Sequence, residues 1–212
     1  MRNLQKLGGM AALCEAGIYI AVFVFYGAFW NFPAAASNAE KLAFLSLHQV
    51  ALSIINLTGY VAFGILLAVL VVAAHERLKE QAETLPKIAS VFGVVWVGLV
   101  MASGMVATIG IKAVVKLAPS EPEQARSLWL AVNTVVEALG GGNEIVGGLW
   151  VLLLSCAALK AKVWPRSLNY LGLAVGTAGI LTVYPAEILT EIFGLSQILW
   201  FLFLGLFMLR KS

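Results

Sequence analysis

Six apolar stretches, each long enough to cross the hydrocarbon core of a bilayer, constrain this chain more than any other feature. They cover residues 7–30, 48–74, 88–115, 128–159, 168–184 and 192–209. A helix needs roughly 17–25 mostly apolar residues to cross about 30 Å of hydrocarbon. Backbone N–H and C=O groups in lipid must pair within the segment, so these stretches are predicted to be α-helices. We expect one domain over residues 1–212, an all-α polytopic membrane protein with a bundle of about six transmembrane helices.

The composition supports the same class of protein. The chain is 61% hydrophobic and 12% charged, whereas a soluble domain carries about 25% charged residues. Its net charge is only +3 and it has no basic run, so nucleic acid is not an expected partner. Membrane lipids are the expected partners, and a homo-oligomer or a membrane partner protein is left open.

Lysine and arginine predict the orientation in the cell membrane, because cytoplasmic segments of membrane proteins carry an excess of both. With the N-terminus inside, ten of these residues fall in cytoplasmic segments: Arg2, Lys6, Arg77, Lys79, Lys87, Lys160, Lys162, Arg166, Arg210 and Lys211. Four fall outside: Lys41, Lys112, Lys116 and Arg126. A multi-pass protein with both termini in the cytoplasm is therefore predicted.

Two carboxylates within the apolar stretches are the first candidates for function. Ionisable residues at membrane depth are costly, and they often mark substrate or ion pathways. Glu15 lies nine positions after Lys6, which is roughly 13 Å along a helix. Glu144 lies in the outer half of its predicted helix. Each glutamate is interpreted as a proton or cation site or as an anchor for a polar ligand head group. The alternative is structural: a neutral glutamate that donates to a nearby carbonyl, or an interhelical hydrogen bond.

The surroundings of Glu144 strengthen its candidacy. Polar or small residues recur there at steps of three and four, which places them on one helix face: Asn133, Glu137, Gly140, Glu144 and Gly148. Asn143 precedes Glu144 and joins the candidate path. The glycine run 140–142 weakens the helix and allows a kink or an unwound turn. Cavity lining and close packing against another helix are both left open.

Three further residues are secondary candidates for the same path. His48 opens the second apolar stretch on the predicted outer side, and Glu187 and Glu191 follow Pro185 at a spacing of four. Together with Glu137, these two carboxylates would attract cations. No metal site is predicted, since the histidines and cysteines show no ligand spacing. The sequence leaves any cofactor unknown.

Several segments resemble a known family. Residues 148–155, 158–160 and 164–172, with Gly176, are similar to the uncharacterised prokaryotic membrane family catalogued as domain of unknown function 4386. The N-terminal residues 7–13, with Tyr19, also resemble the start of that family. The resemblance implies a bundle of six to seven membrane helices and a bacterial or other prokaryotic source. It implies no activity, cofactor or site.

Three classes of function are compatible with these patterns. The first is a small transporter or channel-like protein with a polar path around the membrane glutamates. The second is a non-catalytic membrane subunit or sensor acting through helix packing, which the small residues Gly172, Gly176 and Gly179 favour. The third is a membrane-embedded enzyme acting on a lipid or isoprenoid, so whether the chain is an enzyme is left undecided.

Overall fold

The computed structural model describes residues 2–82, 84–141, 144–184 and 186–210, which form helices and connecting turns without strands. The α-helices are α1 (Arg2–Val24), α2 (Asn38–Leu47), α3 (Gln49–Asn56), α4 (Phe63–Leu78), α5 (Leu85–Leu117), α6 (Pro122–Val136), α7 (Glu144–Ala161), α8 (Arg166–Leu181) and α9 (Glu187–Arg210). Three π-helical segments extend or join them: η1 (Phe25–Phe29), η2 (Leu57–Ala62) and η3 (Glu137–Gly141). The chain is an all-α polytopic membrane protein.

Five helical spans in the described residues are long and apolar enough to cross a membrane. They are Arg2–Phe29, Gln49–Leu78, Leu85–Leu117, Pro122–Ala161 and Ile188–Arg210, the fourth of which runs over residues 142–143. The corresponding predicted stretches begin and end close to these bounds. The largest difference is a start at residue 122, where 128 was predicted. Composition alone therefore located these spans.

The predicted stretch 168–184 corresponds to α8, which is shorter than expected. With 16 residues, α8 falls just below the roughly 17 needed to cross a bilayer. Pro165 occupies its N-cap, next to the first turn, where backbone N–H groups have no partner inside the helix. At the other end the Thr182 hydroxyl donates to the Gly179 carbonyl at 2.7 Å, where the helix ends. The predicted end at residue 184 is thus wrong by three residues.

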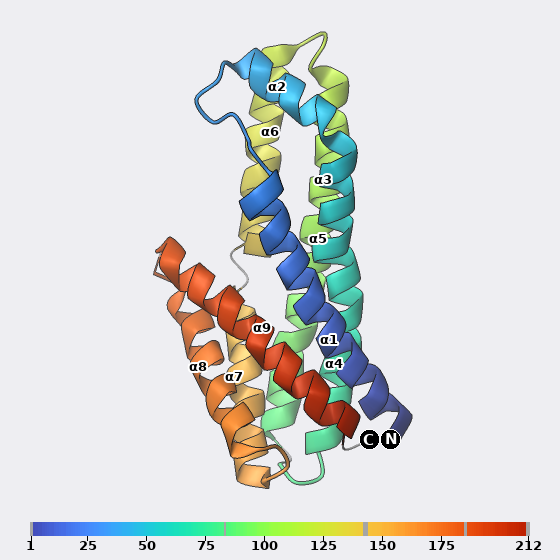
Figure 1. The fold of residues 1–212 in the computed structure, drawn as a ribbon, viewed down its shortest axis with the longest axis vertical. Coiled ribbons are helices and arrows are strands. Elements are labelled where there is room, and N and C mark those ends of the chain that lie inside the picture. Colours follow the sequence, from blue (N-terminus) through green and yellow to red (C-terminus); the bar gives the residue numbers. More distant parts are fainter. Residues whose placement is uncertain (1, 83, 142–143, 185, 211–212) are drawn as a thin grey trace.

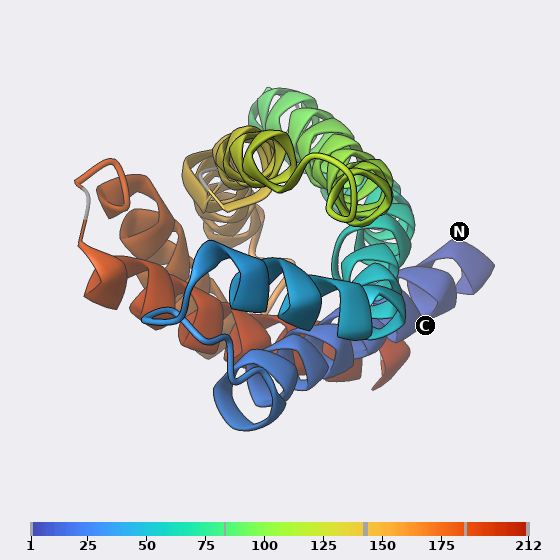
Figure 2. The same cartoon turned by 90° about the horizontal axis from the view of Figure 1, so that it is seen from above.

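The short helix α2 was not predicted. Its N-terminus is a capping box, in which the Ser37 side chain accepts from the Glu40 N–H and the Glu40 side chain accepts from the Ser37 N–H. Such reciprocal bonds satisfy backbone donors that a helix start otherwise leaves free. Viewed from above, α2 lies across the end of the bundle (Figure 2). It packs against α6 and α5 there.

The molecule is elongated, and its two halves differ in their helices (Figure 1). α1 begins and α9 ends at the same end of the molecule. We call the half at that end, built around α4, α7, α8 and α9, the terminal half. We call the opposite half, built around α2, α3 and α6, the distal half. The long helix α5 runs through both.

The terminal half is packed around large aromatic side chains. Trp96, Trp150 and Trp200 come from α5, α7 and α9, and each is at most 1% exposed. The rings of Trp96 and Trp150 lie 5.8 Å apart, and those of Trp150 and Trp200 lie 5.6 Å apart. Trp164 adds a further contact with Trp200. This row of rings links three helices that are distant in sequence.

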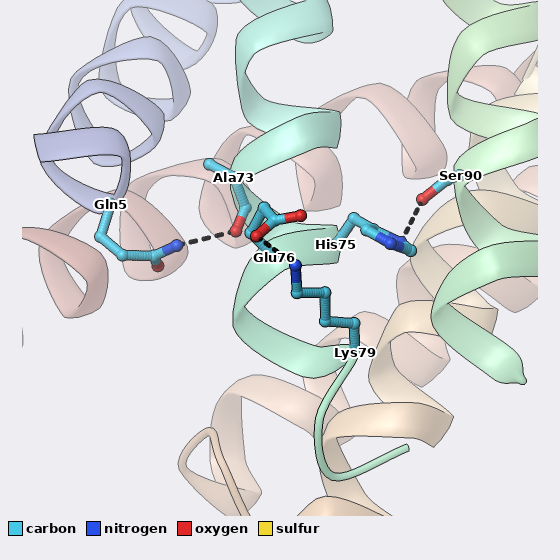
Figure 3. Close-up of polar contacts among 6 residues, drawn as sticks. All are labelled: Gln5, Ala73, His75, Glu76, Lys79 and Ser90. Atoms are coloured by element: carbon cyan, nitrogen blue, oxygen red, sulfur yellow. Dashed lines mark hydrogen bonds and ion pairs between the residues drawn. The ribbon is translucent and has the colours of Figure 1, made fainter. Parts of the chain in front are cut away.

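Polar contacts join the helices at the end of the terminal half (Figure 3). The Gln5 side chain of α1 donates to the Ala73 carbonyl of α4 at 2.8 Å. His75 Nδ1 lies 3.0 Å from Ser90 Oγ of α5. α4 continues to Leu78, beyond the predicted end of its apolar stretch at residue 74, and brings His75 against α5. These bonds hold α1, α4 and α5 together.

The distal half has a smaller apolar core. Six buried residues form it, drawn from α2, α3, α5 and α6: Leu42, Leu45, Leu52, Ile111, Val114 and Ala125. An aromatic group of Trp30, Phe32, Phe44 and His48 covers one side, with ring centroids of Phe44 and His48 4.1 Å apart. The three π-helical segments lie near the junction between this half and the terminal half.

Candidate functional site

A cavity of about 180 Å³ lies between α1, η2, α5, α7 and the first turns of α9. Most of its lining is apolar. The lining side chains that carry polar groups are Tyr19, Tyr26, Asn56, Tyr60, Trp96, Glu144 and Thr190. One water needs about 10–15 Å³ on this measure, so the cavity has room for several waters or one small solute. Glu144 therefore borders open space instead of lipid alone.

A second pocket, of about 60 Å³, adjoins the first. Glu137 and Asn133 line it, together with Trp129 of α6. The two pockets share three lining residues: Tyr26, Asn56 and Tyr60. The shared residues form a wall of hydroxyl and amide groups between Glu144 on one side and Glu137 on the other. Glu137 and Asn133 are exposed, whereas Glu144 is half-buried.

Electrostatic interactions connect the polar groups of the two pockets. The Glu137 carboxylate is close enough for its charge to act on Glu144. It also acts on the hydroxyl groups of Tyr26 and Tyr60. Two carboxylates within range of each other create a negative potential, and clefts lined by one sign of charge concentrate ions of the opposite sign. The arrangement suits a proton or a small cation.

Each of the three π-helical segments contributes to these pockets. η1 supplies Tyr26, η2 supplies Gly59 and Tyr60, and η3 supplies Glu137 and Gly140. A π-helical turn holds an extra residue, which changes the direction of the following side chains. Such turns occur frequently at functional sites. Three of them on one pair of pockets indicate a site at which the backbone departs from regular helix.

The contacts around η3 explain why glycine is needed at position 140. A Cβ atom on Gly140 would overlap Ser103 Oγ and would lie 2.6 Å from the Tyr60 ring. Ser103 also donates its hydroxyl to the Val136 carbonyl at 3.0 Å, where α6 passes into η3. The hydroxyl groups of Tyr60 and Ser103 are hydrogen-bonded as well. The bond from Ser103 holds the irregular turn against α5.

The predicted polar face of residues 133–148 contributes to both pockets. Asn133 and Glu137 line the smaller pocket, and Gly140 and Glu144 line the larger one. Gly148 instead packs against α8. Gly140 lies in the π-helical segment η3, which ends at Gly141. The departure from regular helix that the glycine run allowed is therefore a π-helical turn over these residues. Asn143 and Gly142 lie outside the described residues.

Glu15 does not line either pocket. Its side chain is fully buried in the terminal half, and neither carboxylate oxygen has a hydrogen-bond partner among the described residues. Tyr19 follows one turn later in α1 and lines the larger cavity. The Tyr19 hydroxyl lies within electrostatic range of both Glu15 and Glu144. Tyr19 is therefore near both glutamates, although only Glu144 lines a pocket.

Two of the three secondary candidates, His48 and Glu191, line neither pocket. His48 Nδ1–H donates to the Phe44 carbonyl at 2.9 Å, and its ring stacks on Phe44, so it terminates α2 within the aromatic group. Glu191 is exposed on α9 and lines neither pocket. Glu187 begins α9, and its side chain lies outside what the structure describes. Among the described residues no group of three His, Cys, Asp or Glu side chains is arranged to hold a metal ion.

Among the polar side chains of the site, sequence reasoning missed four that come from α1, η1, α3 and η2. Tyr19, Tyr26, Asn56 and Tyr60 all line the larger cavity. Asn56 carried the only signal, since an amide within an apolar stretch needs a polar partner or water. Tyrosines in membrane helices are common at the bilayer interfaces, so their positions alone did not distinguish cavity lining from anchoring.

Comparison with protein-family models, with curated proteins and with solved structures finds no match for this chain. The resemblance to domain of unknown function 4386 therefore stays a prediction. The functional argument rests on the geometry of the two pockets.

Proposed function

We propose that the protein is a small transporter or channel-like protein that carries protons or a small cation along a path through the two pockets. The path runs from Glu144, past Tyr60 and Asn56, to Glu137 and Asn133. The observation that carries the proposal is the convergence of three π-helical turns on two adjoining pockets, with one glutamate in each.

Three physical considerations support a transport path. Intramembrane carboxylates facing a bundle interior are typical of ion and proton routes. Irregular backbone at membrane depth is tolerated where it lines a cavity or is buried in protein. The exposed Glu137 and the half-buried Glu144 form a graded entry, in which a cation passes from an exposed carboxylate to a more enclosed one.

The size of the larger cavity favours a small cargo over a lipid substrate. Pockets for drug-sized ligands measure roughly 300–1,000 Å³, and this cavity measures about 180 Å³. An enzyme acting on an isoprenoid or lipid would need more space beside Glu144. The helix-packing alternative also loses support, because α8 uses its small residues within the chain. A Cβ on Gly176 would lie 2.7 Å from the Gly148 carbonyl of α7.

We further propose that the terminal half faces the cytoplasm. α1 begins and α9 ends there, and the lysine and arginine excess belongs to the same segments. Reporter fusions at the two ends should both report a cytoplasmic location. Opposite locations of the two reporters would contradict this orientation and the even number of crossings it requires.

The transport proposal is tested by flux into liposomes that contain the purified full-length protein. Internal dyes would follow proton, sodium and methylammonium entry under an imposed gradient. We expect flux well above that of empty liposomes for at least one probe. Glu144→Gln should lower it by tenfold or more, because the amide keeps the shape and removes the charge. Glu137→Gln should lower it less, since this carboxylate is exposed and solvated.

Glu191→Gln is the matched control, because Glu191 is an exposed glutamate outside both pockets. Its flux should equal that of the wild type. No flux of any probe above empty liposomes would reject the proposal. Equal flux in Glu144→Gln and the wild type would also reject it, provided that both proteins insert in equal amounts.

A further inference from the structure

A third cavity, of about 560 Å³, lies apart from the two pockets, between the first turns of α8 and the last turns of α9. Its walls are mainly apolar. Leu168 and Leu171 come from α8, and Phe203 and Phe207 come from α9. Polar groups stand only at one end of this α8–α9 groove, where Ser167 and Arg210 line it. The groove is thus an apolar slot with a cation at its mouth.

Among the residues that the structure describes, the charged side chains around the turn from α7 to α8 and at the end of α9 are positive. Lys160 lies in the last turn of α7, Lys162 follows that helix, Arg166 begins α8, and each is exposed, as is Arg210. No aspartate or glutamate occurs in residues 145–186 or 192–212. In α4, Glu76 is paired with Lys79 at 2.7 Å (Figure 3).

We propose that the α8–α9 groove binds an anionic phospholipid. One acyl chain would lie against Leu168, Leu171 and Phe203. The phosphate would lie at the mouth, where Arg210 would donate to it through two parallel N–H groups, as guanidinium groups do with phosphate. Basic pockets between membrane helices bind the head groups of anionic lipids in this way. The charge at the mouth and the apolar walls together select this occupant.

The groove is shaped to distinguish lipids by charge. A zwitterionic lipid would place its acyl chain equally well and would offer the same phosphate, but its trimethylammonium group would meet the positive residues at the mouth. Like charges disfavour that arrangement by a modest amount where the mouth is open to water. Free phosphate would meet the same cations without the contribution of the apolar walls, so it should bind far more weakly than the whole lipid.

The test measures lipid retention by native mass spectrometry, and thermal unfolding, on the full-length protein in detergent. Phosphatidylglycerol and phosphatidylcholine with the same acyl chains would be added in turn, with inorganic phosphate as a third arm. We expect phosphatidylglycerol to bind at least fivefold more tightly than phosphatidylcholine and to raise the unfolding temperature. Inorganic phosphate should do neither. Equal binding of the two lipids would overturn the proposal, as would stabilisation by inorganic phosphate alone.

Variants separate the head group from the acyl chain. Arg210→Gln should remove the preference for phosphatidylglycerol, whereas Lys112→Gln, at an exposed lysine of α5, should keep it. Leu206→Trp, on an exposed groove residue, should weaken both lipids alike by filling the slot. If Arg210→Gln and Lys112→Gln retain the same preference, Arg210 does not hold the lipid. If Leu206→Trp leaves both affinities unchanged, the acyl chain does not occupy the groove.

Discussion

Three polar side chains buried in the terminal half differ in their contacts from one at the junction with the distal half. In the terminal half, Glu15, Ser155 and Gln197 are fully buried, and their side-chain oxygens have no hydrogen-bond partner among the described residues. At the junction with the distal half, Ser103 is equally buried, but it donates to the Val136 carbonyl. The open volume of the two pockets lies at this junction, since both are lined by residues of η3 and neither is lined by Glu15.

The difference teaches that a polar residue in a membrane helix does not by itself mark a path. Glu15 and Glu144 look alike in sequence, because each interrupts an apolar stretch. The structure separates them by backbone geometry. Regular helices pack closely around Glu15, whereas π-helical turns leave space beside Glu144. A path needs accessible volume as well as a charge, and irregular backbone supplies the volume.

The largest change in stability is expected in the terminal half, where α7 and α8 pack closely against each other. A Cβ at Gly176 would lie 2.7 Å from the Gly148 carbonyl and 2.7 Å from the Leu152 N–H nitrogen. These are backbone atoms, so α7 and α8 would have to separate. Gly176→Leu should lower the free energy of unfolding by about 3 kcal/mol, at the upper end of overpacking costs. Unfolding in detergent micelles would measure it.

Gly98→Leu provides the matched control on α5. Nothing lies within 4 Å of a Cβ at that position, so the new side chain projects outward. Glycine in a helix interior costs about 0.5–1 kcal/mol relative to alanine, so a small gain in stability is expected. A loss for Gly98→Leu comparable to that for Gly176→Leu would show that helix–helix contact does not explain the effect.

A smaller effect should distinguish the two buried serines. Ser103→Ala removes a hydrogen bond to the Val136 carbonyl and should cost about 1 kcal/mol. Ser155→Ala removes a buried hydroxyl without a partner among the described residues, so stability should be unchanged or slightly higher. Parallel thermal unfolding of the two variants would measure both. The contrast drawn between the halves fails if Ser155→Ala proves the more damaging change.

The smallest expected effect concerns pH and the end of the distal half. The Glu40 carboxylate accepts two hydrogen bonds from Ser37, one from its hydroxyl at 2.8 Å and one from its backbone N–H at 2.8 Å. These bonds lower the pKa of Glu40 below its usual value. A lowered folded-state pKa contributes stability that is complete above the unfolded pKa and is lost as pH falls through the folded value.

Hydrogen exchange of the α2 amides (Asn38–Leu47) at a series of pH values would follow this loss. Protection should decline only on the acidic side, below the ordinary range of a glutamate. Glu40→Gln should remove the pH dependence, while the terminal half keeps its protection throughout. A decline of equal size in α2 and α8 would mean that acid acts on the whole bundle and not on the capping box.

The helices were largely predictable, but two features were not. Long apolar stretches identify spans because lipid leaves a backbone no alternative to helix. The short α2 escaped notice because its apolar content is modest, although the pattern of Ser37 and Glu40 is the usual sign of a capping box. The end of α8 was overestimated because Val183 and Tyr184 continue its apolar run beyond the last helical residue.

The candidate site was predictable in part. Asn133, Glu137 and Glu144 share a helix face in the sequence, and the structure places all three on the pockets. Their partners come from other helices. Asn56 and Tyr60 reach the pockets only because α3, η2 and α4 pack against α5, and such pairings between distant segments have no trace in a local pattern.

The sequence by itself determined the solvent of this protein and the elements it must form. Apolar runs of membrane length require lipid, and lipid requires helices, whatever the helices then contact. Only the tertiary structure decided which glutamate borders a cavity and which is enclosed. That choice depends on how side chains from separate helices fill or fail to fill the space between them. Ser103 and Tyr60 limit the space beside Gly140. Both are distant from Gly140 in the chain, so the residues next to Gly140 do not reveal this contact.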